Sequence, residues 1–323
     1  MSFKVSKKTL LGELDEGDIL PDSDFAIHCP KTNQFVQFEY VSKEDEYQTT
    51  PVKPGIWAIT KSQMGFELER TSFVQDRILE EFVHTKHISE KIDCFFQNVH
   101  VYKEEGFEVA KRAALLYGPP GTGKTTVLSK ICNEYVADGK TAIIVWHTDK
   151  FEARHIKGFI KHFDYQGVDK IILVVEDIGG TEMEEVRHRS DSSLLSLLDN
   201  QEKTFTIPTL ILATTNFPEA LLGNLTNRPN RFDDKIEVAF PPPDARGALL
   251  KFFTKDTATD DEVELIKSKK CTDFTPAHIR EIRIRSRIYK KSVKEVIDEM
   301  MKEIEHYKKS FQNKKAMGMG FDD

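Results

Sequence analysis

The stretch Ala113-Ala-Leu-Leu-Tyr-Gly-Pro-Pro-Gly-Thr-Gly-Lys-Thr-Thr126 decides the fold. Its first five residues are apolar and predict a buried strand. Residues 118–125 then fit the phosphate-binding loop pattern G-x-x-x-x-G-K-[ST], and residues 126–132 read as a helix. In such a loop the glycines let backbone N–H groups face phosphate oxygens, the lysine adds a positive charge, and the last hydroxyl is offered to Mg²⁺. The pattern predicts a site for a nucleoside triphosphate.

The composition indicates a soluble, folded chain of about two domains. Of the 323 residues, 39% are hydrophobic and 31% are charged, a balance that supports a buried core. The net charge of −7 gives no overall attraction to nucleic acid or to an anionic membrane. No apolar run approaches the ~18 residues of a membrane span, and residues 1–14 resemble neither a signal peptide nor a presequence. We therefore expect a cytoplasmic protein with no membrane anchor or membrane partner.

The cysteines predict neither a disulfide framework nor a zinc knuckle. They lie far apart and form no Cys-x-x-Cys pair: Cys29, Cys94, Cys132 and Cys271. His84 and His87 lie near Cys94 but lack a fourth ligand at a suitable spacing. We expect reduced thiols and histidines on a helix surface.

The order of apolar runs predicts an α/β fold. Runs at 142–146, 171–175, 210–213 and 236–240 alternate with helical segments, and with 113–117 they predict a P-loop NTPase sheet of five parallel strands. Ligands of such sheets bind beyond the carboxyl ends of the strands. The expected parts are a small β-rich N-terminal region and possible adaptor at 1–75, a nucleotide-binding α/β domain at 76–243, a helical lid at 244–310 and a flexible tail at 311–323.

Polar residues follow two of these strands. The strand 171–175 ends in Glu176-Asp177, which suits a Walker B strand: one carboxylate holds Mg²⁺ and the other orients or deprotonates the attacking water. The strand Thr209 to Thr215 is followed by Asn216, whose neutral amide suits the γ-phosphate or that water. These residues extend the predicted site.

Two arginines lie three residues apart in Asn227-Arg-Pro-Asn-Arg-Phe-Asp233. Guanidinium groups at the spacing of Arg228 and Arg231 suit a phosphoryl group whose charge is redistributing. The alternative is a pair of surface arginines bound to Asp233 and Asp234. The spacing alone leaves both open.

Together, GPPGTGKT, LVVEDI, ATTN, NRPNRFD and KIEVAFPPPDAR resemble the ATPase module of AAA proteins over about residues 75–300. In detail the motifs are most similar to the AAA group that includes the mitochondrial translocase of the Rieske protein. That protein has a membrane anchor, which we do not expect here. We therefore carry over the ATPase mechanism and not the substrate.

The resemblance implies a role for each matching residue. ATP is bound by the loop residues Gly118, Pro119, Pro120, Gly121, Thr122, Gly123, Lys124, Thr125 and Thr126. It implies Mg²⁺ on Thr125 and Glu176, water activation by Asp177, and a sensor at Asn216. Arg228 and Arg231 resemble arginine fingers that reach a neighbouring subunit's nucleotide. Such a head-to-tail contact implies a homo-oligomeric ring, most often a hexamer.

The sequence departs from the common AAA pattern in three places. Glu176-Asp177 reverses the usual Asp-Glu, so either Glu176 takes the metal with Asp177 as base, or Asp177 takes the metal and Ile178 replaces the base. The group resemblance favours the first. Residues 147–152 lack the aromatic-hydrophobic-glycine sequence of threading unfoldases, with Phe151 the one nearby aromatic. Ala277 stands where many relatives have a sensor arginine, one helical turn from Arg280.

We hypothesise an ATP-hydrolysing AAA motor that remodels or translocates a protein client. The alternative is a nucleic-acid-linked AAA+ ATPase such as a helicase loader or replication accessory factor. Its signal is a basic strip at helical spacing: Arg280, Arg283, Arg287, Lys290, Lys291 and Lys294. Interleaved apolar and acidic residues favour an amphipathic lid helix with a solvated face instead.

Overall fold

The computed structural model describes residues 4–6, 25–29, 34–40, 46–51, 53–62, 65–73, 83–147, 156, 159–160, 167–179, 194–195, 197–199, 205–221 and 231–316. The chain divides into two compact units. The first is built from the described parts of 1–77, 83–118 and 124–237, and the second from those of 78–82, 119–123 and 238–323. Each unit has a core of its own.

The five predicted parallel strands form the centre of the first unit, in the order β11-β7-β10-β9-β8. This confirms the predicted α/β fold with a P-loop sheet. The strands are β7 (Lys111–Tyr117), β8 (Thr141–Trp146), β9 (Lys170–Val175), β10 (Thr209–Thr215) and β11 (Asp234–Glu237). β11 ends earlier than the predicted run at 236–240, and Pro243, after the N-cap Pro242, begins the next helix.

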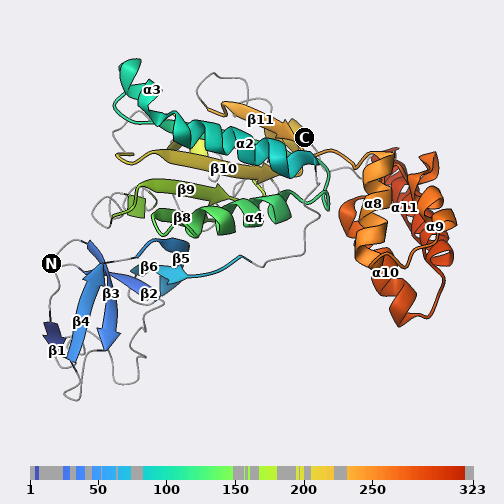
Figure 1. The fold of residues 1–323 in the computed structure, drawn as a ribbon, viewed down its shortest axis with the longest axis horizontal. Coiled ribbons are helices and arrows are strands. Elements are labelled where there is room, and N and C mark those ends of the chain that lie inside the picture. The colour runs from blue at the N-terminus through green and yellow to red at the C-terminus, as the bar shows by residue number, and fades with distance from the viewer. Residues whose placement is uncertain are drawn as a thin grey trace. The chain divides into compact units, whose positions relative to one another are not determined.

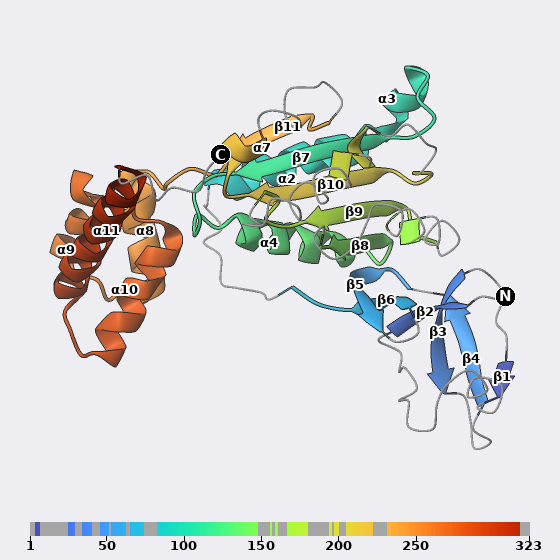
Figure 2. The ribbon, with the colours of Figure 1, turned by 180° about the vertical axis from the view of Figure 1, so that it is seen from behind.

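The inner strands β8 and β10 are buried along their whole length, as expected for a parallel sheet that is covered on both faces. Helices α2 (Val83–Gln97) and α4 (Lys124–Val136) cover one face, as Figures 1 and 2 show. The short helices α3 (Val99–Glu104) and α7 (Pro218–Leu221) follow α2 and β10.

The N-terminal strands continue the same sheet. Their bounds are β1 (Lys4–Ser6), β2 (Phe25–Cys29), β3 (Gln34–Tyr40), β4 (Glu46–Pro51), β5 (Gly55–Ser62) and β6 (Gly65–Arg70). β5 pairs in parallel with β8, from Gly55 opposite Ala142 to Ala58 opposite Val145. The remaining strands pair antiparallel in the order β1-β4-β3-β2-β6-β5. Within the described residues one sheet of eleven strands results.

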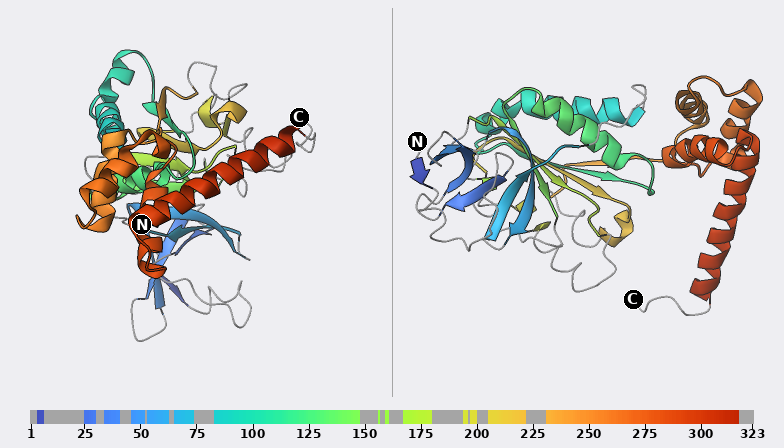
Figure 3. Two further views of the ribbon diagram at one scale, coloured as in Figure 1. Left: turned by 90° about the vertical axis from the view of Figure 1, so that its right-hand side faces the viewer. Right: turned by 90° about the horizontal axis from the view of Figure 1, so that it is seen from below.

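The described elements of the second unit are helical. This unit contains α8 (Pro243–Thr254), α9 (Asp260–Lys267), a 3₁₀ turn (Lys269–Cys271), α10 (Pro276–Ile288) and α11 (Val293–Ala316). Figure 3 shows α11 extending well beyond the other helices of this unit. Its helix continues through residues 311–316, which the sequence analysis assigned to a flexible tail. Among the described residues, no helix combines the length and apolar character that crossing a bilayer requires.

Backbone groups at the helix ends of the second unit are hydrogen-bonded by side chains. Thr259 and Thr275 each form a capping box at the start of α9 and α10. The guanidinium of Arg246, 2% exposed, donates hydrogen bonds of 2.8–3.0 Å to four carbonyl oxygens. Those oxygens belong to Pro241, Ile266, Lys267 and Ser268. Arg246 therefore satisfies the carbonyls that end α9.

Candidate functional site

The glycine loop lies at the carboxyl end of β7, the strand between β10 and β11. β7 ends at Tyr117 and α4 begins at Lys124. Buried side chains fix both flanks of the loop, Leu115 and Leu116 in the strand and Val127 and Leu128 in the helix. The N–H groups at the start of α4 and its dipole favour an anion at this position.

The Lys124 side chain is held at the base of the loop. Its Nζ donates a hydrogen bond of 2.7 Å to the carbonyl oxygen of Gly118, and the residue is 6% exposed. Burial lowers the pKa of Lys124, and the nearby Asp177 carboxylate acts in the opposite direction. A phosphate bound here would favour the charged ammonium in the same way.

Thr125 and Glu176 meet at the next position. The Thr125 hydroxyl donates to Oε2 of Glu176 at 3.1 Å. Thr125 lies in the first turn of α4 and Glu176 directly follows β9. The pair supplies two hard oxygen ligands of the kind that Mg²⁺ prefers.

Asp177 is turned away from the path of β9 toward β10. Its φ of 52° is in the left-handed region, which costs a non-glycine residue about 1 kcal/mol or more. Its N–H donates to the Thr214 hydroxyl at 3.0 Å, and its Oδ1 accepts a hydrogen bond of 2.8 Å from Nδ2 of Asn216. The Thr215 hydroxyl donates to the Ile178 carbonyl at 2.7 Å and fixes the turn. The two carboxylates of Glu176-Asp177 therefore have different partners.

Thr214 and Thr215 were not singled out in the sequence. They read there as the end of an apolar strand, and the strand prediction explained them fully. The available signal was two hydroxyl residues in succession just before Asn216. Their hydrogen bonds join the end of β10 to the turn after β9.

The middle of the glycine loop belongs to the second unit. Gly121 has a φ of +78°, and a Cβ there would lie 2.9 Å from the Thr275 hydroxyl and 3.2 Å from the Ala277 Cβ. The Ala277 N–H donates to the Gly121 carbonyl at 3.3 Å. In the same segment the Thr122 hydroxyl donates to the Pro119 carbonyl at 2.9 Å. Ala277 is thus a backbone contact of the loop, and a larger residue at 121 does not fit.

Arg231 has a partner that the sequence analysis did not name. It is 5% exposed, and its Nε and Nη2 donate to Oδ1 and Oδ2 of Asp199 at 2.8 and 2.9 Å. Asp234 pairs with Lys91 and Arg112 instead. Both are contacts within the first unit.

Two residues singled out in the sequence, Arg228 and Phe151, lie outside the described residues. Within the described part of the chain, no three His, Cys, Asp or Glu side chains gather as a metal cluster. Cys94, Cys132 and Cys271 are free thiols, as predicted for them.

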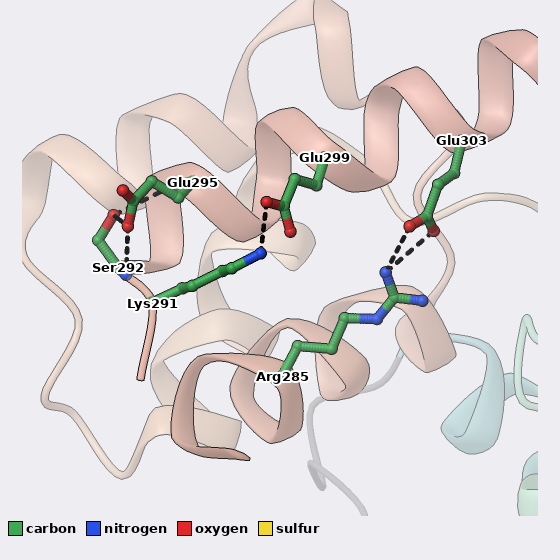
Figure 4. A network of polar contacts seen from close by, with 6 residues as sticks. All are labelled: Arg285, Lys291, Ser292, Glu295, Glu299 and Glu303. Atoms are coloured by element: carbon green, nitrogen blue, oxygen red, sulfur yellow. Dashed lines mark hydrogen bonds and ion pairs between the residues drawn. The ribbon is translucent and has the colours of Figure 1, made fainter. Parts of the chain in front are cut away.

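The basic strip on the lid is partly neutralised. Figure 4 shows Lys291 paired with Glu299 at 2.6 Å and the neighbouring Arg285 paired with Glu303 at 2.9 Å. Arg285 also contacts Glu281 on its own helix at 3.1 Å. Arg280 and Arg287 lie on the exposed face of α10. This pattern is typical of a solvated amphipathic helix.

Residues 114–240 match a family model described as "ATPase family associated with various cellular activities (AAA)". The chain is similar to the cell division cycle protein 48 homolog of Archaeoglobus fulgidus, 28% identical over 55% of this chain and 25% of that protein. It is also similar to the proteasome-activating nucleotidase of Methanothermobacter thermautotrophicus, 29% identical over 65% of this chain and 53% of the relative.

A third relative is the human "ATPase family gene 2 protein homolog A", 31% identical over 51% of this chain and 19% of the relative. The chain therefore spans at most about half the length of these three curated relatives. The family model matches residues 114–240, most of which belong to the first unit.

Proposed function

We propose that this chain, whose residues 114–240 form an AAA ATPase domain, binds ATP with Mg²⁺ and hydrolyses it to ADP and phosphate. The observation that carries the proposal is the meeting of three pairs at the carboxyl ends of neighbouring strands. The pairs are Lys124 with Gly118, Thr125 with Glu176, and Asp177 with Asn216. The first pair joins the two ends of the glycine loop, and each of the other two joins segments that the parallel sheet brings together.

Thr125 and Glu176 are proposed to hold the metal. Their oxygens lie within hydrogen-bond distance and belong to two different segments, so they fit an ion placed between them. Magnesium, when bound there, would neutralise charge on the β- and γ-phosphate oxygens. Lys124 would add a positive charge next to the same phosphates, and its burial strengthens that interaction.

Asp177 and Asn216 are proposed to orient the attacking water. The carboxylate of Asp177 accepts the proton of the water, and the amide of Asn216 holds that carboxylate in place. The left-handed turn at Asp177 separates its side chain from Glu176. This supports the first of the two sequence alternatives, with Glu176 as metal ligand and Asp177 as base.

Assembly as a ring is the second part of the proposal. We propose that Arg228 completes the nucleotide site of a neighbouring copy in a homo-oligomeric ring of six chains. The client is proposed to be a protein, in keeping with the names of the proteasome-activating relatives. A nucleic-acid client is the other outcome of the test.

Phosphate release tests the proposal. Wild-type chain with ATP and Mg²⁺ should release phosphate at a rate per chain that rises with protein concentration, and Lys124→Ala should lose this activity at least about 10²-fold. Lys130→Ala, on the same helix but outside the loop, is the control and should keep wild-type activity. A wild-type chain that releases no phosphate at any concentration would overturn the proposal.

The client is tested by capture. Asp177→Asn held in ATP should retain a bound protein client that wild-type chain releases. Retention of nucleic acid instead, weakened steeply by salt and by loss of Arg283 and Arg287, would favour the alternative function.

A further inference from the structure

The segment Arg231-Phe232-Asp233-Asp234, which leads into β11, is anchored at its central residues by backbone and core contacts. Phe232 is 5% exposed and packs in the core of the first unit. The N–H of Asp233 donates to the Ala113 carbonyl at 2.9 Å, and its Oδ2 accepts from the Ala113 N–H at 2.8 Å. The start of β11 is therefore fixed against β7.

Arg231 adds a contact to a different part of the chain. Its guanidinium binds both carboxylate oxygens of Asp199, at 2.8 and 2.9 Å. Asp199 follows the helical residues 197–198, whose leucines lie in the same core. The same segment is also bound by Lys111, whose Nζ donates a hydrogen bond to the Leu198 carbonyl. Arg231 thereby joins the start of β11 to the segment that ends at Asp199.

Such a contact is costly to give up. The Arg231 side chain is 6% exposed, so its charge is almost fully removed from water, and the Asp199 carboxylate is a negative partner for it. A two-pronged contact also fixes the orientation of the guanidinium plane. An arginine that reached a second chain's nucleotide would have to break both hydrogen bonds and leave Asp199 beside the partly buried Lys111.

We infer that Arg231 is a positioning residue that acts through Asp199 in its own chain, and that it is not a second arginine finger. Arg228 lies three residues earlier, so its Cα is within about 11 Å of the anchored residue. The pair fixes the position of Arg231, which follows Arg228 by three residues in the sequence. This role rests on the proposed function only in so far as Arg228 acts on ATP.

The experiment compares Asp199→Asn, Arg231→Gln and the double variant. Each single change removes the ion pair, and both should lower kcat for phosphate release by about 10²-fold with the KM for ATP unchanged. The double variant should be no slower than either single one, because the two residues act as one unit. Asp138→Asn breaks the pair of Asp138 with Lys170 in the same unit and is the control, expected at wild-type rate; the Asp138 side chain is 30% exposed and that of Asp199 is 32% exposed.

A different result identifies a finger. Wild-type kcat in Asp199→Asn together with an inactive Arg231→Gln would overturn the inference, as would losses that multiply in the double variant. If a variant does not fold, Arg231→Lys takes its place, because it keeps the charge and loses the two-pronged contact. A folded Arg231→Lys with reduced kcat and unchanged KM supports the inference, and full activity contradicts it.

Failure of the proposed function would be recognised separately. If wild-type chain releases no phosphate, the unfolding midpoints of the wild type, the two single variants and the double variant still test the ion pair. A double variant whose midpoint shift is smaller than the sum of the two single shifts supports the contact between Arg231 and Asp199, and a shift equal to that sum contradicts it.

Discussion

The carboxyl edge of the nucleotide sheet and the helical second unit are stabilised in opposite ways. At the sheet edge, Lys124 is partly desolvated and Asp177 holds a left-handed backbone. In the second unit, Arg246 binds four carbonyls and the helices begin with capping boxes. The comparison indicates that the desolvated lysine and the left-handed backbone, which lower the stability of the fold, lie at the sheet edge that is proposed to bind phosphate. In the second unit, the hydrogen bonds of Arg246 and of the two capping boxes have the opposite effect.

The largest expected effect is on the second unit. Arg246→Ala leaves four carbonyl oxygens without their donor and should destabilise this unit by about 3–5 kcal/mol. Both tryptophans, Trp57 and Trp146, belong to the first unit, so far-UV circular dichroism should show the loss in a transition that tryptophan fluorescence does not follow. Equal shifts in both signals would mean that the contrast between the units is wrong.

Gly121→Ala should have the next largest effect. The left-handed φ and the 2.9 Å approach to the Thr275 hydroxyl should together cost about 1–3 kcal/mol, weakening ATP binding about tenfold or more. Gly139→Ala is the control, since it has a similar φ but nothing within 4 Å of its Cβ. Titration with a fluorescent ATP analogue measures both variants, and equal affinities would show that the crowding at 121 is unimportant.

The variant Asp177→Gly tests whether the left-handed backbone at the sheet edge lowers stability. Asp177→Gly should raise the free energy of unfolding by up to about 1 kcal/mol while abolishing phosphate release. Lys255→Gly, at the left-handed C-cap of α8, should give a similar gain with activity unchanged. A stabilised variant at 177 that still hydrolyses ATP would remove Asp177 from the chemistry.

The smallest effect is expected at the exposed ion pairs of the lid. Arg285→Ala breaks the contact with Glu303 shown in Figure 4, whose side chain is 58% exposed, and should cost about 0.2–1 kcal/mol. The loss should shrink further in 1 M salt. A stability loss of several kcal/mol in a thermal melt would contradict this expectation and show that the pair is a main source of stability in the second unit.

Much of the fold was predictable because runs of apolar residues mark the buried strands directly in the sequence. The run at 171–175 is fully buried in β9 apart from its flanking lysine, and the resemblance to AAA ATPases is confirmed by the match at 114–240. The pairing of β5 with β8 was not predictable, since alternation in residues 55–59 predicts a strand but not its neighbour. The partners of a strand depend on contacts far apart in the sequence.

The site was predictable as a set of residues but not as a geometry. Spacing identified Glu176, Asp177 and Asn216, yet left open which carboxylate takes the metal. The Glu176 carboxylate accepts from the Thr125 hydroxyl and the Asp177 carboxylate accepts from the Asn216 amide, and neither contact follows from residue order. Asp199 was missed because a lone acidic residue after a helical segment has no pattern that links it to Arg231.

The division of labour between the two carboxylates is the central claim, and binding measured beside turnover tests it most directly. Asp177→Asn should bind an ATP analogue with wild-type affinity and Mg²⁺ dependence, yet release phosphate at least about 10²-fold more slowly. Glu176→Gln should lose the Mg²⁺ dependence of binding. Loss of Mg²⁺-dependent binding in Asp177→Asn, with Glu176→Gln unaffected, would contradict the account.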